Sequence, residues 1–188
     1  MRKLKLQVQM SVDGYIAGEN GELNWATMEW SDDLKNYVDE ITRPVDTILL
    51  GRNLAEGFIP YWAGVAADAS NPEQEAGQLF SQTPKIVFSH TLDLSKWENT
   101  EVEKGDFVGR INGLKAQSGG DLIAYGGGKF VSSLIREKLI DELHLFVNPV
   151  ILGKGMSIFR EVVVPQKLNL AGSRKFECGI SVLVYTLA

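Results

Sequence analysis

Three consecutive glycines, Gly126-Gly127-Gly128, follow the apolar run 121–125 and precede a segment with helical periodicity. Glycine tolerates positive φ and lets a ligand approach the backbone closely. The N–H groups of such a turn and of the following helix converge on one spot that favours a phosphate group, and Lys129 adds positive charge. The full Gly-x-Gly-x-x-Gly motif is absent, so a tight turn without a ligand is the alternative interpretation.

Two other strand ends carry side chains that suit a phosphate. Gly51-Arg52 follows the apolar run 47–50, and Ser89-His90 follows the run 85–88. Arginine forms bidentate contacts with phosphate, whereas the ordinary alternatives are a surface arginine and a turn-capping serine. Because the carboxyl ends of parallel strands meet at one edge of a sheet, the three strand ends together predict a nucleotide site.

The other residues that could contact a ligand are two acids and an aromatic residue. Asp32 and Asp33 follow Ser31 at the start of a helical pattern, where acids ordinarily complement the helix dipole. A carboxylate facing the crevice would instead bind an amino-substituted heterocycle or transfer a proton. Trp25 lies in the loop-like stretch 17–29, where it either closes over a ligand or packs against the core.

Metal centres and activated nucleophiles have little support in the sequence. Cys178 is the single cysteine, and the two histidines, His90 and His144, lie far apart. We therefore predict no disulfide and no metal site. His144 alternates with apolar residues and is expected to be a hydrogen-bonded histidine on the face of a sheet. The Gly-x-Ser-x-Gly motif of hydrolases is also absent.

The elements that must position these residues alternate between strand and helix. Period-two or apolar runs predict strands at 4–10, 47–50, 85–89, 121–125, 143–147, 168–174 and 180–186. Helical spacing predicts helices after Ser31, at 108–116 and around 130–139. Prolines and glycines make 60–84 the least regular stretch, with at most a short helix starting near Asn71. We expect one α/β domain over 1–188, with a mainly parallel sheet and an antiparallel C-terminal edge.

Composition narrows the classes of function. The chain has 188 residues and a net charge of −5, which disfavours a broad nucleic-acid interface. No apolar stretch reaches the length of a membrane span or a signal peptide, so we expect a cytoplasmic protein. Apolar alternation at 143–147 and 180–184 exceeds what one core needs, which predicts a homodimer through the C-terminal strands.

The ordered set of motifs resembles the dihydrofolate reductase-like superfamily. The segments that carry the resemblance are Ser11–Ala17, Gly51-Arg52, Lys85–Ser89, Tyr125–Gly128, Asp141–Leu143 and Pro149–Gly155. The most similar branch is the reductase domain of the bifunctional riboflavin-biosynthesis deaminase–reductase and its stand-alone relatives. The resemblance implies a three-layer α/β/α fold that binds NADPH and delivers hydride to a pteridine- or pyrimidine-like heterocycle.

The resemblance also implies roles for single residues. Ile16 and Ala17 match backbone contacts to the nicotinamide carboxamide, and Arg52 with Asn53 matches a phosphate-binding position. Residues matching the 2′-phosphate site are Ser89 and His90, and those matching the pyrophosphate turn are Gly126, Gly127, Gly128 and Lys129. Asp33, or Asp32 one residue earlier, matches the acid that binds the substrate, and Trp25 matches a tryptophan beside it.

Two classes of function follow from these patterns. The first is an NADPH-dependent reductase whose substrate is a riboflavin-pathway 5-amino-6-ribosylaminouracil phosphate, a folate or another heterocycle. The second is a nucleotide-binding protein of the same fold without catalysis, because the patterns support a cofactor site more strongly than a catalytic acid.

Overall fold

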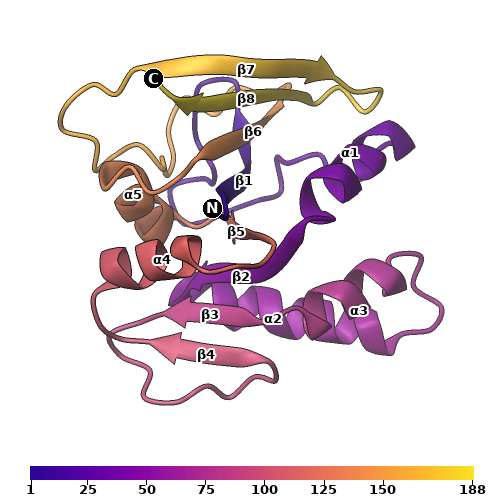
Figure 1. The fold of residues 1–188 in the computed structure, drawn as a ribbon. Helices are drawn as coiled ribbons and strands as arrows, with labels where there is room; N and C mark the ends of the chain where they lie inside the picture. Colours follow the sequence, from indigo (N-terminus) through magenta and orange to yellow (C-terminus); the bar gives the residue numbers. More distant parts are fainter.

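The computed structural model describes residues 1–188, which form one eight-stranded sheet with helices on both faces (Figure 1). The strands are β1 (Leu4–Ser11), β2 (Val45–Gly51), β3 (Lys85–Phe88), β4 (Thr100–Glu103), β5 (Asp121–Tyr125), β6 (Glu142–Asn148), β7 (Leu168–Lys175) and β8 (Ser181–Leu187). The helices are α1 (Asp32–Thr42), α2 (Arg52–Ala67), α3 (Gln74–Gln82), α4 (Phe107–Ala116) and α5 (Gly128–Arg136).

The strand order is β4-β3-β2-β5-β1-β6-β8-β7, with β1 between β5 and β6 near the middle. The first six strands of this order pair in parallel, whereas β8 is antiparallel to both β6 and β7. Parallel pairing places the carboxyl ends of β1, β2, β3, β5 and β6 at one edge of the sheet. This arrangement confirms the predicted parallel sheet with an antiparallel C-terminal edge.

The helices form two outer layers, because both faces of the sheet are apolar over most of their area. Leu4, Leu6, Val8 and Met10 of β1 pack with residues of α4 and α5 in the largest core cluster. On the opposite face, α1 covers β6 and β8 through a cluster that includes Leu34 and Phe146. The pair α2–α3 covers β2, β3 and β5 on the same face. The three-layer α/β/α prediction is therefore confirmed.

The stretch predicted to be irregular is in fact mostly helical. Helix α2 runs from Arg52 to Ala67 and continues through Pro60, and α3 follows at Gln74. Phe58 and Trp62 lie on either side of Pro60, and both pack against Phe80 of α3 at ring-centroid distances of 5.1 and 5.8 Å. This tertiary packing outweighs the loss of one helical hydrogen bond at proline.

The apolar alternation that predicted a dimer is buried within the chain itself. Leu143 and Leu145 are 3% and 7% exposed, and Val182 is 1% exposed, because these residues line the two core clusters beside α5 and α1. The exposed apolar residues of the C-terminal region instead lie on β7 and just before it: Val163, Val164, Leu168 and Leu170. None of the helices is long and apolar enough to span a bilayer.

Candidate functional site

Three strand ends meet at the carboxyl edge of the sheet. A Cβ on Gly51 would lie 2.7 Å from the Cβ of Phe130, so only glycine lets the β2–α2 turn approach α5 this closely. The ring of Phe130 also stacks on Phe88, at the end of β3, with a centroid distance of 4.9 Å. A Cβ on Gly127 would lie 3.6 Å from the Cβ of Leu54. The turns after β2, β3 and β5 are therefore neighbours.

Two helices begin at this meeting point with their N-terminal N–H groups free. Gly51 is the N-cap of α2 and Gly127 is the N-cap of α5; neither supplies a capping side chain, and neither first turn contains an acid. By contrast, the Asp106 side chain caps α4 by accepting from the Val108 N–H. Gly127 has φ +112°, which is accessible to glycine and strained for other residues. Such paired, uncapped ends attract anions.

Basic side chains surround these two helix ends. Arg52 forms an ion pair with Glu56 at 2.9 Å, and both side chains are about two-fifths exposed. Lys129 is exposed and forms no ion pair. A Cβ on Gly128 would lie 3.8 Å from a guanidinium nitrogen of Arg160, which is likewise exposed and free of ion pairs. Arg160 was not among the sequence candidates, because its position depends on how the chain after β6 returns to α5.

Ser89 and His90 lie beside this edge in different environments. Ser89 is 8% exposed, and its hydroxyl accepts hydrogen bonds from the Thr91 and Leu92 N–H groups at 3.1 and 3.0 Å. The hydroxyl is thus committed to the turn after β3. His90 is exposed. Their contact with a phosphate stays a prediction.

The segment after β1 is held against the segment after β6. Ile16 N–H donates to the Met156 carbonyl at 2.8 Å, and Met156 N–H donates to the Ala17 carbonyl at 2.9 Å. A Cβ on Gly155 would collide with the Ala17 carbonyl oxygen, which explains the glycine at that position. The Ile16 carbonyl and the Ala17 N–H make no hydrogen bond within the protein, so both are available to a ligand.

Asp13 joins the same two segments. Its carboxylate accepts from the Ser11 hydroxyl at 2.7 Å and from the Leu152 and Gly153 N–H groups at 3.1 and 2.7 Å. The hydrogen bond from the Ser11 hydroxyl is the main reason that the pKa of Asp13 lies below its ordinary value. The carboxylate therefore fixes a loop beside the site.

The first turn of α1 places Asp33 against the β7–β8 hairpin. Its carboxylate accepts from the Ser31 hydroxyl at 2.5 Å, from the Leu34 N–H at 2.9 Å and from the Glu177 N–H at 3.2 Å. The Ser31 contact is the main reason that the pKa of Asp33 is lowered. Asp32 is fully exposed. No contact joins either acid to the strand ends, and a catalytic role for Asp33 stays a prediction.

The loop before α1 carries Trp25, which is half-buried and donates its indole N–H to the Glu22 carbonyl at 3.0 Å. Trp30, which was not among the sequence candidates, donates to the Thr27 carbonyl and stacks on Phe146 with a centroid distance of 6.1 Å. The Thr27 N–H donates to Asn148 at the end of β6. Hydrogen bonding and stacking thus anchor this loop to β6.

His144 fulfils its prediction as a hydrogen-bonded histidine on a sheet face. The Tyr37 hydroxyl lies 2.8 Å from its Nδ1, and its Nε2 lies 3.3 Å from Glu142. Burial is the main cause of the lowered pKa of His144, against the opposing influence of Glu142. The ring is therefore neutral at pH 7 and joins α1 to β6.

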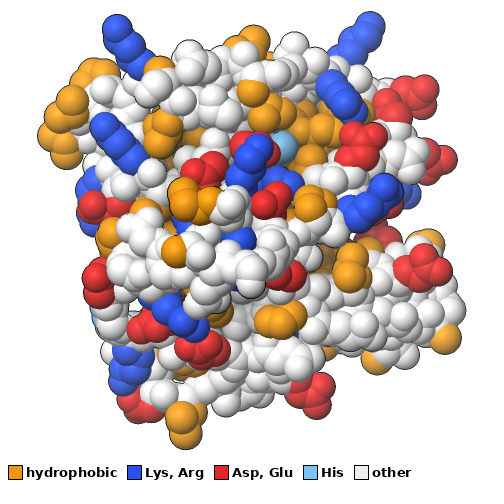
Figure 2. All heavy atoms as spheres, viewed as in Figure 1, with side chains coloured by type: hydrophobic (Ala, Val, Ile, Leu, Met, Phe, Trp, Pro, Cys, Tyr) orange, Lys and Arg blue, Asp and Glu red, His pale blue; other side chains and the backbone are white.

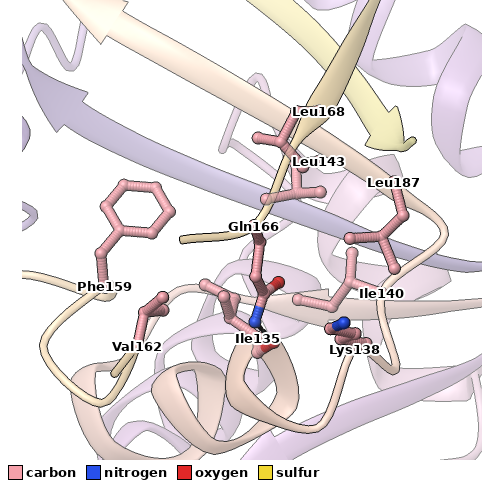
Figure 3. Close-up of a pocket in the computed structure, with 9 residues that line it drawn as sticks. All are labelled: Ile135, Lys138, Ile140, Leu143, Phe159, Val162, Gln166, Leu168 and Leu187. Atoms are coloured by element: carbon pink, nitrogen blue, oxygen red, sulfur yellow. Dashed lines mark hydrogen bonds between the residues drawn. The ribbon is translucent and has the colours of Figure 1, made fainter. Parts of the chain in front are cut away.

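An apolar pocket of about 220 Å³ lies away from this edge (Figure 3). It is lined by Ile135, Lys138, Ile140, Leu143, Phe159, Val162, Gln166, Leu168 and Leu187. The Gln166 amide donates to the Ile135 carbonyl at the end of α5. None of the predicted site residues lines this pocket, which instead borders the exposed edge strand β7.

The model of the RibD C-terminal domain family matches residues 2–182. Among proteins of known sequence, YyaP of Bacillus subtilis (strain 168) is 30% identical over 187 residues, which cover 98% of this chain and 94% of YyaP. YwjB of the same organism is 28% identical over 177 residues, covering 93% of this chain and 92% of YwjB.

Two solved structures have a similar fold. A Shewanella sp. PV-4 protein assigned to riboflavin biosynthesis superposes with a TM-score of 0.75 at 24% identity, covering 100% of this chain and 99% of its own. The Thermotoga maritima diaminohydroxyphosphoribosylaminopyrimidine deaminase/5-amino-6-(5-phosphoribosylamino)uracil reductase gives a TM-score of 0.69 at 21% identity. This chain is covered completely by that match and corresponds to 57% of the bifunctional protein.

Proposed function

Because the chain belongs to the RibD C-terminal domain family, we propose that it is a reductase that binds NADPH and reduces a pyrimidine- or pteridine-like heterocycle. The observation that carries the proposal is the meeting of two uncapped helix ends, those of α2 and α5, beside Arg52, Lys129 and Arg160. A dinucleotide with an additional phosphate has the negative charge that these groups can bind.

The residues at this edge suit the different parts of NADPH. The N–H groups at Gly126–Lys129, with Arg160 beside Gly128, would hold the pyrophosphate. Arg52 would bind the 2′-phosphate. For this contact, its guanidinium must either divide its N–H donors between the phosphate and Glu56 or break its ion pair with Glu56. The free Ile16 carbonyl and Ala17 N–H would bind the nicotinamide carboxamide, since an amide requires one acceptor and one donor. Bound NADPH supplies the hydride.

The chain's own residues contribute binding, orientation and exclusion of water. Asp13 and Gly155 hold the segment containing Ile16 and Ala17 in place, which fixes where a nicotinamide would lie. Trp25 and its loop would cover the ligand and exclude solvent. Since the Asp33 carboxylate accepts three hydrogen bonds and its pKa is lowered, we propose that a water molecule near Trp25 delivers the proton to the substrate.

The proposal is tested first by cofactor binding. Titration of the purified protein with NADPH, followed by tryptophan fluorescence, should give saturable binding. Arg160→Ala should weaken that binding about tenfold, as expected for loss of a charged contact. The control is Arg43→Ala, which removes the same charge from the exposed C-cap of α1. Equal affinities for all three proteins would contradict the proposed pyrophosphate site.

The second test is turnover. NADPH oxidation is followed with a panel of pteridines, pyrimidinediones and aminopyrimidines as substrates. Hydride transfer to at least one member of the panel is expected. Tight NADPH binding without oxidation by any of them would support the alternative of a nucleotide-binding protein without catalysis.

A further inference from the structure

Arg52 differs from the other basic residues of the candidate site because it already holds an acid. Lys129 and Arg160 form no ion pair, whereas Arg52 pairs with Glu56. Charge pairing is common on this molecule, and Figure 2 shows acidic and basic side chains intermingled around β3 and β4. A carboxylate bound to an arginine at an anion-binding edge has a further effect, because it changes which anion that arginine favours.

The geometry of the pair follows from helix α2. Arg52 is the first residue of this helix, and Glu56 lies one turn later on the same side. Arg52 Nη1 donates to Glu56 Oε1 at 2.9 Å, and neither side chain has another hydrogen-bond partner in the protein. The ion pair therefore draws the Glu56 carboxylate back toward the start of α2, where the N-terminal N–H groups are uncapped.

Arg52 keeps the capacity to bind a second anion. Its contact with Glu56 uses one N–H group of a guanidinium fork, and the remaining N–H groups are free. A phosphate could therefore reach Arg52 while Glu56 is still bound. Two anions would then share one cation at a half-exposed position, and their mutual repulsion would offset part of the attraction to Arg52.

The two nicotinamide cofactors differ in the group that would face this pair. NADPH carries a 2′-phosphate on its adenosine ribose, and NADH carries a hydroxyl there. A phosphate monoester is strongly anionic at pH 7 and accepts hydrogen bonds, as a carboxylate also does. A hydroxyl instead has a proton to donate, and acidic side chains bind ribose hydroxyls in this way. The Glu56 carboxylate thus opposes the 2′-phosphate and suits the 2′-hydroxyl.

Building on the proposed function, we propose that Glu56 is a specificity-determining residue: it competes with the 2′-phosphate for Arg52 and so reduces the preference for NADPH over NADH. The pyrophosphate is common to both cofactors, and the groups assigned to it, Lys129 and Arg160 beside the start of α5, hold no acid. Glu56 therefore acts on the choice between the cofactors more than on dinucleotide binding in general.

The ratio of the two cofactor affinities tests this inference. The purified protein is titrated with NADPH and with NADH at pH 7 and low ionic strength, followed by tryptophan fluorescence. Glu56→Gln keeps the size of the side chain and removes its charge. This variant should bind NADPH at least threefold more tightly and NADH no more tightly, which raises the preference for NADPH. The gain should shrink in high salt, because exposed charges are screened.

The matched control is Glu40→Gln. Glu40 forms a similarly exposed ion pair with Arg174 at 3.2 Å, between α1 and β7, and its substitution should leave the affinity ratio unchanged. A double variant shows whether Glu56 acts through Arg52. When Glu56→Gln is added to Arg52→Ala, the gain for NADPH should be smaller than in the wild-type background, because no arginine is left to compete for.

Three results would overturn the inference while leaving the proposed cofactor site intact. These are an unchanged affinity ratio in Glu56→Gln, an equal change in Glu40→Gln, and an undiminished gain in the Arg52→Ala background. A merely structural role for the ion pair would lower the melting temperature and alter both affinities equally. Failure of the folded wild-type protein to bind either cofactor would instead contradict the proposed function, and this inference with it.

Discussion

Arg52 is the residue expected to separate NADPH from NADH. Replacing Arg52 with Ala removes a charged contact to the 2′-phosphate, which is worth roughly 1.5–3 kcal/mol. We therefore expect NADPH to bind about 10- to 150-fold more weakly, with little change for NADH. Calorimetric titration with both cofactors measures the difference.

The matched control for Arg52 is Arg43→Ala, which changes the net charge equally at the other end of the sheet. An equal loss of affinity for NADPH and NADH in Arg52→Ala would assign Arg52 to a phosphate that both cofactors carry.

At the scale of single residues, local patterns predicted the glycine turn and Arg52 as phosphate contacts, because a strand end followed by glycine or arginine is visible in the sequence; the contacts stay predictions. The position of Arg160 could not be predicted, because its proximity to Gly128 depends on the path of the chain between them. The burial of Gln7 and Gln9 was unpredictable for a different reason. Their alternation with apolar residues resembles a solvated strand face, and only the sheet order places that face between two helical layers.

At the scale of elements, the turn between β5 and α5 is the most informative target. Gly127 has φ +112°, and a methyl group there would meet Leu54 at an ordinary contact distance of 3.6 Å. Gly127→Ala therefore costs backbone strain of about 1–2 kcal/mol rather than a steric clash. If the turn holds the pyrophosphate, NADPH affinity should fall at least tenfold, as measured by fluorescence titration alongside thermal melting.

Gly179→Ala is the control for backbone strain, because Gly179 has φ +89° in the β7–β8 hairpin, with Pro149 nearest at 3.5 Å. It should lower the melting temperature similarly and leave NADPH affinity unchanged. The same loss of affinity in both variants would show that strain, and not the phosphate, is responsible.

The contact of α1 with β6 predicts how stability responds to acid. Burial lowers the pKa of His144 in the folded protein, so the unfolded chain binds this proton more readily. The effect of His144 on the free energy of unfolding is then constant above about pH 6.5, and below it lowers stability as the pH decreases, with a slope of at most ~1.4 kcal/mol per pH unit. Urea unfolding between pH 7.5 and 5 measures this slope, which His144→Gln should flatten.

The neighbouring carboxylate acts in a separate pH range. Burial raises the pKa of Glu142, but hydrogen bonds from Lys3 and His144 outweigh it, and the net shift is downward. Its contribution is therefore lost only below about pH 4.3, its ordinary value. An undiminished slope in His144→Gln between pH 6.5 and 5 would assign the acid sensitivity to another group.

Most elements were predictable because their periodicity is local, as in 121–125 and the helix that follows. Helix α2 was not, since Pro60 signals a break in the sequence. Its continuation depends on aromatic packing of Phe58 and Trp62 against Phe80 in α3, which is a tertiary property.

At the scale of the whole molecule, we propose that the chain forms a homodimer through β7. This strand is an unpaired sheet edge that exposes Leu168 and Leu170, at 37% and 58%, beside the apolar pocket of Figure 3. Light scattering at micromolar concentration should give the dimer mass. Leu170→Lys should shift it toward the monomer.

The matched control for the dimer is Leu94→Lys, in the connection between β3 and β4, where Leu94 is 84% exposed. That variant should remain dimeric. A monomeric mass for the unmodified protein would contradict the proposed assembly.

The central place of β1 also has a consequence for synthesis on the ribosome. This strand emerges first, yet its partners are β5 and β6, and Asp121 follows Ser11 by 110 positions in the sequence. At about 5–20 residues per second, the nascent strand waits roughly 5–20 s for its first partner. Its alternating leucines stay uncovered throughout that interval. Newly made chains are therefore expected to engage chaperones at their N-terminus until β6 has been translated.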